Sequence, residues 1–360
     1  MRNSTCLQPS FATTVALPVI YSILFTTGSL GNILSAWIFS RKIPTMQKRA
    51  QYIYLANLVA ANLLICSTMP FLAAYFAGGF QWPYDSAICR IANHPSTVVL
   101  HVNMYVTITI LCSTALSQYA TLKKSNDFSQ VARPVNKSFY RRALEKFRQP
   151  KFAKNLCITI WITVVCVTVI AITYDAEAKP GQEFHQCYNI KVESGEYTTR
   201  IAASVATACF FVSFITVLMS YYSLTRHLSK IQKNTCIGKK HLIYRTVRRN
   251  ILIIQIILIV CFLPYHTFRP FFYVLLTNKD CQRLNYLVEI KNFLTCLAAA
   301  KSSLDPLITL LLDKTFKESL YSLFGKCTSK DHKRRADNST EETPPTRKND
   351  GTTPREYDYQ

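Results

Sequence analysis

Residues 201–225 read IAASVATACFFVSFITVLMSYYSLT and contain no Asp, Glu, Lys or Arg. An α-helix needs about 20 mostly apolar residues to cross the roughly 30 Å hydrocarbon core of a bilayer. A water-soluble helix of this length would need a polar face, which this stretch lacks. Its Val, Ile, Thr and Phe residues favour strands in water, but in lipid a single segment satisfies its own backbone hydrogen bonds only as a helix. The stretch therefore predicts a transmembrane helix.

Six other stretches have the same character. The whole set comprises residues 17–40, 52–76, 91–122, 155–174, 201–225, 250–276 and 284–312. The first five contain no charged residue, whereas the last two contain a few. Within the third, His94-Pro95 predicts an irregular turn near one end of the span. The sequence thus predicts an all-α membrane protein, a bundle of seven transmembrane helices.

Positive charge gathers in the segments that follow spans one, three, five and seven. The chain has 42 Lys and Arg residues against 20 Asp and Glu, a formal net charge of +22. Most of the basic residues lie in 41–50, 121–154, 226–249 and 313–360. Because basic loops stay in the cytoplasm, we expect an extracellular N-terminus and a cytoplasmic C-terminus, at the plasma membrane. Topology and contact with anionic membrane lipid account for the net charge, so nucleic acid is not an expected partner.

The two ends of the chain differ from the spans. We expect residues 1–14 to form an extracellular N-terminus and residues 15–312 to form the seven-span domain. Residues 313–327 carry apolar side chains one helical turn apart and predict a short amphipathic eighth helix on the membrane surface. Residues 328–360 are polar and predict a disordered cytoplasmic tail.

Modification sites and cysteines fit this topology. Asn3 begins an Asn-Ser-Thr sequon on the outer side, so we expect N-glycosylation there. Cys327 follows the amphipathic helix on the inner side and is a candidate for palmitoylation. Four of the 13 cysteines fall on the outer side, where disulfides form: Cys6, Cys89, Cys187 and Cys281. Four cysteines allow three pairings, and their spacing does not choose among them.

Short motifs occur in a fixed order along the spans. They are Gly31-Asn32, Leu55-Ala56-Asn57-Leu58, Met69-Pro70-Phe71, Trp161, Tyr221, Cys261-Phe262-Leu263-Pro264-Tyr265-His266 and Leu304-Asp305-Pro306-Leu307-Ile308. In this order, and with seven spans, the chain resembles the rhodopsin-like G-protein-coupled receptors over residues 15–327. The resemblance implies a receptor for a small extracellular ligand, with heterotrimeric G proteins and arrestin as partners.

Three further residues are similar to the purinergic-receptor-like branch of that family. The branch has a His and an Arg three residues apart after the proline of span six, here His266 and Arg269. It also has a Lys near the outer end of span seven, here Lys291. The resemblance implies an anionic ligand, a nucleotide or a lysophospholipid. The disulfides that it implies are Cys89–Cys187 and Cys6–Cys281.

A guanidinium and an ammonium beside tyrosine rings suit an anionic group attached to an apolar or aromatic body. The candidate ligand site comprises Tyr105, Tyr265, His266, Arg269, Tyr273 and Lys291. Simpler interpretations are open for each charged or titratable member. Arg269 can extend to the outer lipid headgroups, Lys291 can pair with Glu289 or with the acidic outer loop, and His266 can be a satisfied interior residue.

The inner end of span three departs from the family pattern. The family has an acidic residue, Arg and Tyr there, and this chain has Ser117-Gln118-Tyr119. Gln118 has no charge, so it cannot form the resting ion pair. The alternative to ligand-driven signalling is therefore a receptor that is constitutively active or couples weakly. The other expected switch residues are Tyr221, Phe262, Pro264, Asp305 and Pro306.

Span seven contains Lys301, and a lysine inside a membrane costs several kcal/mol unless it is paired. Asp305 lies one turn further on the same helix face, and Asn62 of span two can accept another of the ammonium's hydrogen bonds. Asn62 stands where the family has the acidic residue of its sodium site. We hypothesise an internal ion pair in which the Lys301 ammonium stands in for the sodium ion. The alternative places Lys301 in a water-filled vestibule.

Other function classes have little support in the sequence. Neither H-E-x-x-H nor G-x-S-x-G occurs, and no metal-ligand spacing is present. We therefore expect no enzyme, no cofactor and no metal. A transporter is the alternative from another class, but no internal repeat stands out, and the charged residues in the spans are confined to the sixth and seventh.

Overall fold

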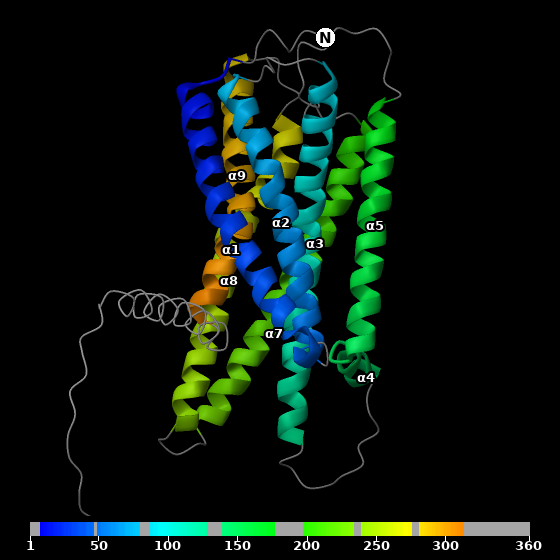
Figure 1. The fold of residues 1–360 in the computed structure, drawn as a ribbon, viewed down its shortest axis with the longest axis vertical. Coiled ribbons are helices and arrows are strands. Elements are labelled where there is room, and N and C mark those ends of the chain that lie inside the picture. The colour runs from blue at the N-terminus through cyan, green and yellow to red at the C-terminus, as the bar shows by residue number, and fades with distance from the viewer. Residues whose placement is uncertain are drawn as a thin grey trace, which may run out of the picture. The chain divides into compact units, whose positions relative to one another are not determined.

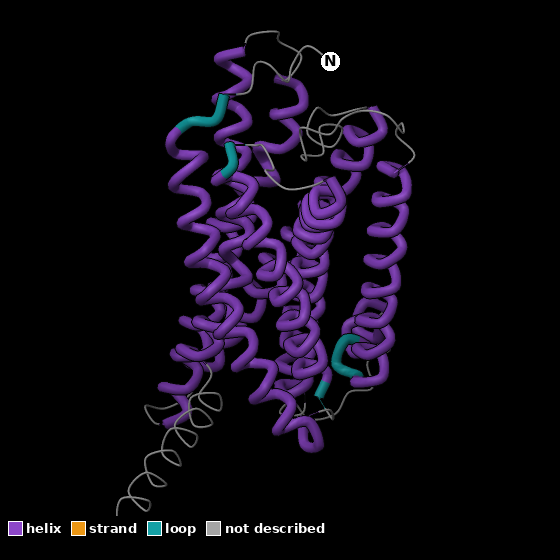
Figure 2. The backbone as a smooth tube through the Cα atoms, turned by 45° about the horizontal axis from the view of Figure 1, so that its top comes forward, coloured by secondary structure: helices purple, strands orange, loops and turns teal. Residues whose placement is uncertain are grey.

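Seven long helices make up most of the part of the chain whose structure is described. The computed structural model describes residues 8–46, 49–79, 86–127, 139–176, 197–233, 239–275 and 281–312. The long helices are α1 (Leu17–Met46), α2 (Ala50–Ala77), α3 (Ser86–Asp127), α5 (Pro150–Ala176), α7 (Tyr197–Lys233), α8 (Lys239–Leu275) and α9 (Cys281–Leu312). Within these ranges the chain has no strand (Figure 2), and the all-α prediction is confirmed.

Some sequence-based expectations lie outside the described residues. They concern Asn3, Cys6, Cys187, Cys327, the side chain of Cys89 and residues 313–360. Two short elements were not expected from the sequence. They are α4 (Phe139–Lys146) and the π-helical turn η1 (Ala12–Ala16), which leads directly into α1.

Each predicted span coincides with one long helix, and most of the helices extend beyond the apolar stretch at both ends. The irregular turn expected at His94-Pro95 is wrong, because α3 runs as one helix from Ser86 to Asp127. A proline removes a single backbone hydrogen bond, and a helix packed among others tolerates that loss. Helices α2, α8 and α9 likewise continue through internal prolines.

Helix α9 differs from the other six long helices in its charge. Among the described residues, six helices are long and apolar enough to cross a membrane on composition alone, and α9 is not one of them. Two of its charged side chains are nonetheless buried, since Lys291 is 8% exposed and Lys301 is 3% exposed. Helix α9 packs against α8 and α1, so these charges lie inside the bundle rather than in lipid. The prediction of a seventh span therefore agrees with the packing of α9, although α9 does not qualify on composition alone.

The long helices run side by side (Figure 1), and their contacts close into a ring. Helix α1 contacts α2 and α9, α2 contacts α3, α3 contacts α7, and α8 contacts both α7 and α9. Helix α5 packs against α2 and α3. Trp161 of α5 donates a hydrogen bond from Nε1 to Asn57 Oδ1 of α2 at 2.9 Å, which fixes the depth of α5 against its neighbour.

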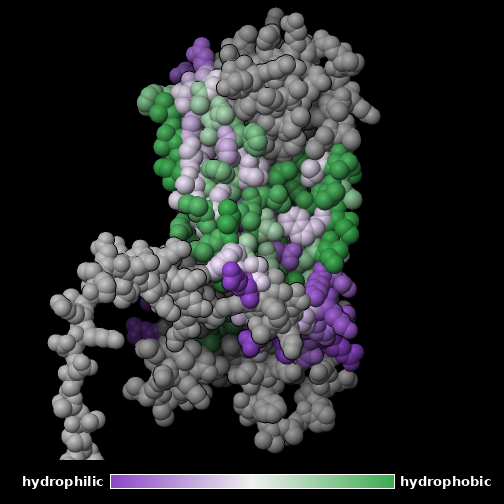
Figure 3. Space-filling model, in the orientation of Figure 1, coloured by the Kyte–Doolittle hydropathy of each residue, from purple (hydrophilic) through white to green (hydrophobic). Residues whose placement is uncertain are grey.

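The outward surface of the bundle is apolar where lipid would lie. On α5, Ile158, Ile162, Val165 and Val169 are each more than half exposed. Figure 3 shows hydrophobic residues over the middle of the helices on the face drawn, with hydrophilic residues below, where α4 and the start of α5 lie. An exposed apolar surface of this kind suits acyl chains and would promote aggregation in water.

Two glycines bring α1 and α9 unusually close together. A Cβ atom added to Gly31 would lie 2.7 Å from Cγ and 2.8 Å from Cβ of Pro306. One added to Gly28 would lie 2.5 Å from the Ser303 hydroxyl oxygen. Close helix approach at small residues is a typical way to join transmembrane helices. It places Asn32 of α1 next to the charged residues of α9.

Candidate functional site

The Arg269 side chain lies among tyrosines between α8 and α3. Its Nη1 donates a hydrogen bond to the Tyr105 hydroxyl at 2.7 Å. Its Cζ lies 6.0 Å from the ring centroid of Tyr265, and Tyr273 is a further hydrogen-bonding neighbour. The structure thus brings Arg269 together with three other candidate ligand-site residues. Within the described part of the chain, Arg269 forms no ion pair with a carboxylate.

His266 lies one turn before Arg269 and is enclosed by aromatic rings. Its imidazole stacks on Phe210 of α7, with centroids 3.6 Å apart and an interplanar angle of 15°. The Tyr105 ring meets it at 5.4 Å in an edge-on arrangement. The imidazole is 1% exposed, and its Nδ1 has no hydrogen-bond partner among the described residues. The His266 ring therefore packs as an interior histidine would. Its Nδ1 atom, however, lacks the hydrogen bond that a satisfied interior histidine has.

Lys291 of α9 also lies beside α8, but it contacts a different aromatic residue. Its Nζ lies 5.2 Å from the ring centroid of Phe272, the residue before Tyr273 on α8. Glu289, the partner suggested for Lys291 in the simpler interpretation, accepts a hydrogen bond from the Ser10 hydroxyl. Arg269 and Lys291 thus both lie beside aromatic side chains of one short stretch of α8, residues 265–273.

The segment before α1 is joined to the start of α9. The backbone N–H of Gln8 donates to Asn285 Oδ1 at 3.1 Å, in addition to the Ser10–Glu289 hydrogen bond. Cys281, the first residue of α9, is disulfide-bonded, and its partner lies outside the described residues. The N-terminal segment therefore packs at the same end of the bundle as Lys291.

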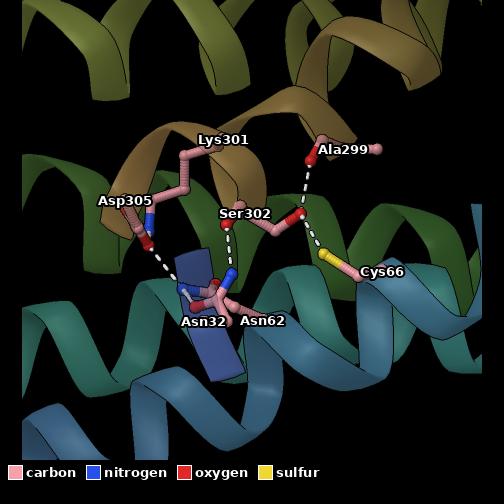
Figure 4. A network of polar contacts seen from close by, with 7 residues as sticks. All are labelled: Asn32, Asn62, Cys66, Ala299, Lys301, Ser302 and Asp305. Carbon is pink, nitrogen blue, oxygen red and sulfur yellow. Dashed lines mark hydrogen bonds and ion pairs between the residues drawn. The ribbon is translucent and has the colours of Figure 1, made fainter. Parts of the chain in front are cut away.

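A second polar cluster lies where α1, α2 and α9 meet (Figure 4). Lys301 Nζ forms an ion pair with Asp305 Oδ2, one turn away on α9. Asn62 Nδ2 donates to the same Asp305 oxygen at 3.0 Å and to Asn32 Oδ1 at 3.3 Å. Asn32 Nδ2 donates to the backbone carbonyl of Ser302 at 2.9 Å, which completes the connection from α2 through α1 back to α9.

The hydrogen bond that Asn62 makes in this cluster differs from the expected one. We expected its amide oxygen to accept a hydrogen bond from Lys301, but its Nδ2 instead donates to Asp305. Asn62 Oδ1 is buried and has no partner among the described residues. The reason is that the Asp305 carboxylate lies between the two side chains and accepts from both. The vestibule alternative does not fit Lys301, which is buried and paired.

The expected switch residues lie along the interior of the bundle. Gln118 and Tyr119 are half-buried in α3, and the preceding Ser117 is fully buried. Tyr221 of α7 and Phe262 of α8 are 2% and 1% exposed. Pro264 and Pro306 lie inside α8 and α9.

Two contacts of the site were missed by sequence reasoning. The stacking of Phe210 on His266 has no sequence signal, because Phe210 is one of 21 phenylalanines and lies in a uniformly apolar span. The hydrogen bond of Asn32 to Ser302 does have a sequence signal, because an amide within an apolar helix indicates a polar contact.

Comparison with known proteins identifies the class. The family model described as "7 transmembrane receptor (rhodopsin family)" matches residues 31–136 and 139–308, so the chain belongs to that family. It is therefore a multi-pass membrane receptor and not an enzyme. The resemblance to rhodopsin-like receptors is confirmed.

Individual relatives indicate the branch of the receptor family to which the chain is most similar in sequence. The chain is 49% identical to human "Probable G-protein coupled receptor 82" over 329 residues, which cover 91% of this chain and 97% of the relative. It is 48% identical to the mouse protein of the same name, over 90% of this chain and 99% of the relative. Human purinoceptor 13 is 26% identical over 94% of this chain and 91% of the relative. These similarities agree with the purinergic-like branch.

Proposed function

We propose that this receptor binds an extracellular ligand with an anionic group on an apolar or aromatic body, and that it signals through heterotrimeric G proteins. The observation that carries the ligand class is the Arg269 guanidinium. It is part-buried among tyrosines and pairs with no carboxylate among the described residues. An enclosed guanidinium of this kind has donors available for a bidentate contact with phosphate or carboxylate.

The aromatic residues around Arg269 suit the apolar or aromatic part of such a ligand. His266, Phe210, Tyr105 and Tyr265 present ring faces and edges beside Arg269. Lys291 adds a second cation beside the same stretch of α8. A nucleotide and a lysophospholipid both combine a phosphate with a large apolar or aromatic group, so both fit this chemistry.

We further propose that the end of the bundle carrying Lys291 faces the exterior. Exposed basic side chains are found on α4 and at the start of α5: Arg142, Lys146, Lys151 and Lys154. Arg226 near the end of α7 and Arg249 near the start of α8 are also exposed. Basic residues flanking spans favour the cytoplasmic side, and this surface is where a G protein, and arrestin as the family resemblance implies, would bind.

Arg269→Ala is expected to reduce the potency of an anionic agonist by about 10- to 100-fold, because a hydrogen bond to a charged group contributes about 1.5–3 kcal/mol. Lys291→Ala should reduce potency as well. The measurement is G-protein activation in membranes, with a panel of nucleotides and phosphorylated or carboxylated lipids as probes. Arg283→Ala is the matched control, since Arg283 is exposed at the start of α9. An active probe with the same potency on both pocket variants would exclude the anion site.

A second candidate function is a receptor that is constitutively active or that couples weakly to its G protein. The sequence Ser117-Gln118, in place of the acidic residue and Arg of the family, favours it. Gln118→Arg is expected to raise ligand-independent G-protein activation. An arginine there gains a contact with the G protein, whereas Ser117 offers no carboxylate to hold it at rest. The double variant Ser117→Asp/Gln118→Arg restores the resting pair and should bring basal activity down again. Equal basal activity in the wild type and both variants would show that position 118 does not control coupling.

A further inference from the structure

A group of exposed basic side chains lies outside the proposed ligand site, on α4 and the first turns of α5. We call it the α4–α5 patch, and its members are Arg142, Lys146, Lys151 and Lys154. Residues 139–155 contain six basic residues and one acidic residue, an excess of five positive charges. Within the described part of the chain, none of the four side chains of the patch forms an ion pair or a hydrogen bond. No described group of the receptor therefore neutralises this charge.

Helical geometry places two members of the patch on one side of each helix. Arg142 and Lys146 are about one turn apart on α4, on the side away from Leu144, which is 5% exposed. Lys151 and Lys154 are likewise about one turn apart on α5. Each helix thus presents two cations in one direction, where both can approach the same anionic group.

The connection between α4 and α5 is short and fixed by contacts. The backbone N–H of Gln149 donates to the Lys146 carbonyl at 2.9 Å. The Phe147 and Phe152 rings meet edge-on with centroids 5.2 Å apart, and the Tyr54 hydroxyl of α2 donates to the Phe147 carbonyl at 3.4 Å. The two pairs of cations are therefore held in a fixed relation, and a preorganised site of this kind loses less conformational freedom on binding than a mobile loop does.

The patch lies directly below the part of α5 that suits lipid. Lys151 and Lys154 share one face of α5 with Ile158 and Ile162, which are both more than half exposed. Lys154 is one turn, about 6 Å along the axis, from Ile158. Figure 3 shows the same order at the side of the bundle, with hydrophilic residues beneath the hydrophobic surface of α5. The ammonium groups therefore reach the depth of the lipid headgroups, at the side of the bundle rather than at its end.

We propose that the α4–α5 patch binds the headgroup of a phosphoinositide, a lipid whose inositol ring carries several phosphates, in the inner leaflet. The proposal rests on the orientation proposed above, which places α4 on the cytoplasmic side. Four cations around a fixed corner match several phosphates, whereas phosphatidylserine offers a single net negative charge. Continuity with the apolar surface of α5 favours a membrane lipid over a soluble phosphate compound. The bound headgroup would lie beside the surface proposed to meet the G protein.

The test is binding of a fluorescent dioctanoyl phosphatidylinositol bisphosphate to the purified full-length receptor in detergent, measured by fluorescence anisotropy. Unlabelled dioctanoyl phosphatidylserine should compete at least about tenfold more weakly than the unlabelled bisphosphate lipid, because it has fewer charges. Inositol trisphosphate carries the phosphates without acyl chains and should also compete more weakly.

Lys151→Gln/Lys154→Gln is expected to weaken binding about 25-fold, since each basic residue near an anionic headgroup contributes about fivefold. Arg142→Gln/Lys146→Gln should weaken binding by a similar factor, because both pairs contact one headgroup. All four side chains are exposed, so both variants should keep the wild-type Tm in the absence of lipid.

Two controls separate the site from net charge and from folding. Arg226→Gln/Arg249→Gln removes the same charge from exposed positions on α7 and α8, and it should leave the affinity for the lipid unchanged. Lys151→Arg/Lys154→Arg keeps both charges of the patch and should keep its binding.

Three results would overturn the proposal. The first is unchanged affinity in either patch variant, and the second is an equal loss in the Arg226→Gln/Arg249→Gln control, which would show that only net charge matters. The third is competition by phosphatidylserine or inositol trisphosphate as strong as that of the bisphosphate lipid. Binding in detergent requires neither an extracellular ligand nor an orientation in a bilayer. Failure here would therefore leave the proposed function standing, since Arg269→Ala tests that function separately.

Discussion

Replacing Asp305 by Ala is expected to lower the free energy of unfolding by about 3–5 kcal/mol, because it leaves a buried ammonium without its carboxylate. Lys301 is 3% exposed, so water cannot replace the lost partner without opening the bundle. The substitution also removes the oxygen to which Asn62 donates at 3.0 Å. A loss of this size would leave little folded receptor at the cell surface.

Surface expression and thermal unfolding of the purified protein measure the effect. Leu307→Ala is a suitable control, because Leu307 is two residues away on α9 and 43% exposed. The double variant Lys301→Met/Asp305→Leu should recover most of the lost stability, since an apolar pair of similar volume often replaces a buried ion pair at no cost. If the double variant were as unstable as Asp305→Ala, an unpaired charge would not be the cause of the instability.

The helical structure of the spans could be predicted from the sequence because lipid leaves few alternatives. A stretch such as 201–225 has only one way to satisfy its backbone inside a bilayer, and every such stretch is helical. The ends of the helices could not be predicted equally well. Helix α7 extends to Lys233, well past the apolar stretch, and in water neither hydropathy nor charge marks where a helix stops.

Helix α4 forms within a segment whose composition is that of a basic loop. In its sequence FYRRALEK, Tyr140, Ala143 and Leu144 nevertheless follow a helical spacing. Leu144 is 5% exposed, and α4 packs against α3. Apolar residues at i, i+3 and i+4 predict a short amphipathic helix even inside a segment rich in charge.

The two polar clusters differ in how far the sequence determines them. The Lys301–Asp305 pair follows from a four-residue spacing on one helix, so it needs no knowledge of neighbouring helices. The contacts of Asn62 and Phe210 depend on which faces of different helices meet. Spacing along one helix carries no information about that, which is why the donor role of Asn62 and the ring beneath His266 were not predicted.

Replacing Gly31 by Val is expected to prevent most of the receptor from folding, because α1 would have to move away from α9. Even the Cβ of an alanine would lie 2.7 Å and 2.8 Å from two ring carbons of Pro306. A proline ring cannot rotate aside, so the helices must separate. Overpacking of this kind costs about 1–3 kcal/mol or more. Separation would also break the Asn32–Ser302 hydrogen bond of the polar cluster where α1, α2 and α9 meet, and this would add to the loss of stability.

Gly28 provides the comparison that distinguishes a rigid obstacle from a flexible one. A Cβ at Gly28 would meet the Ser303 hydroxyl and the Cys66 thiol, at 2.5 Å and 2.7 Å, and both of these side-chain ends can rotate away. Gly28→Ala should therefore be milder than Gly31→Ala, in surface expression and in Tm, although its nominal overlap is larger. Leu30→Ala is the neutral control, because Leu30 is 65% exposed on the outer side of α1. If Gly31→Val kept the wild-type Tm, the close approach of α1 to Pro306 would not be required for folding.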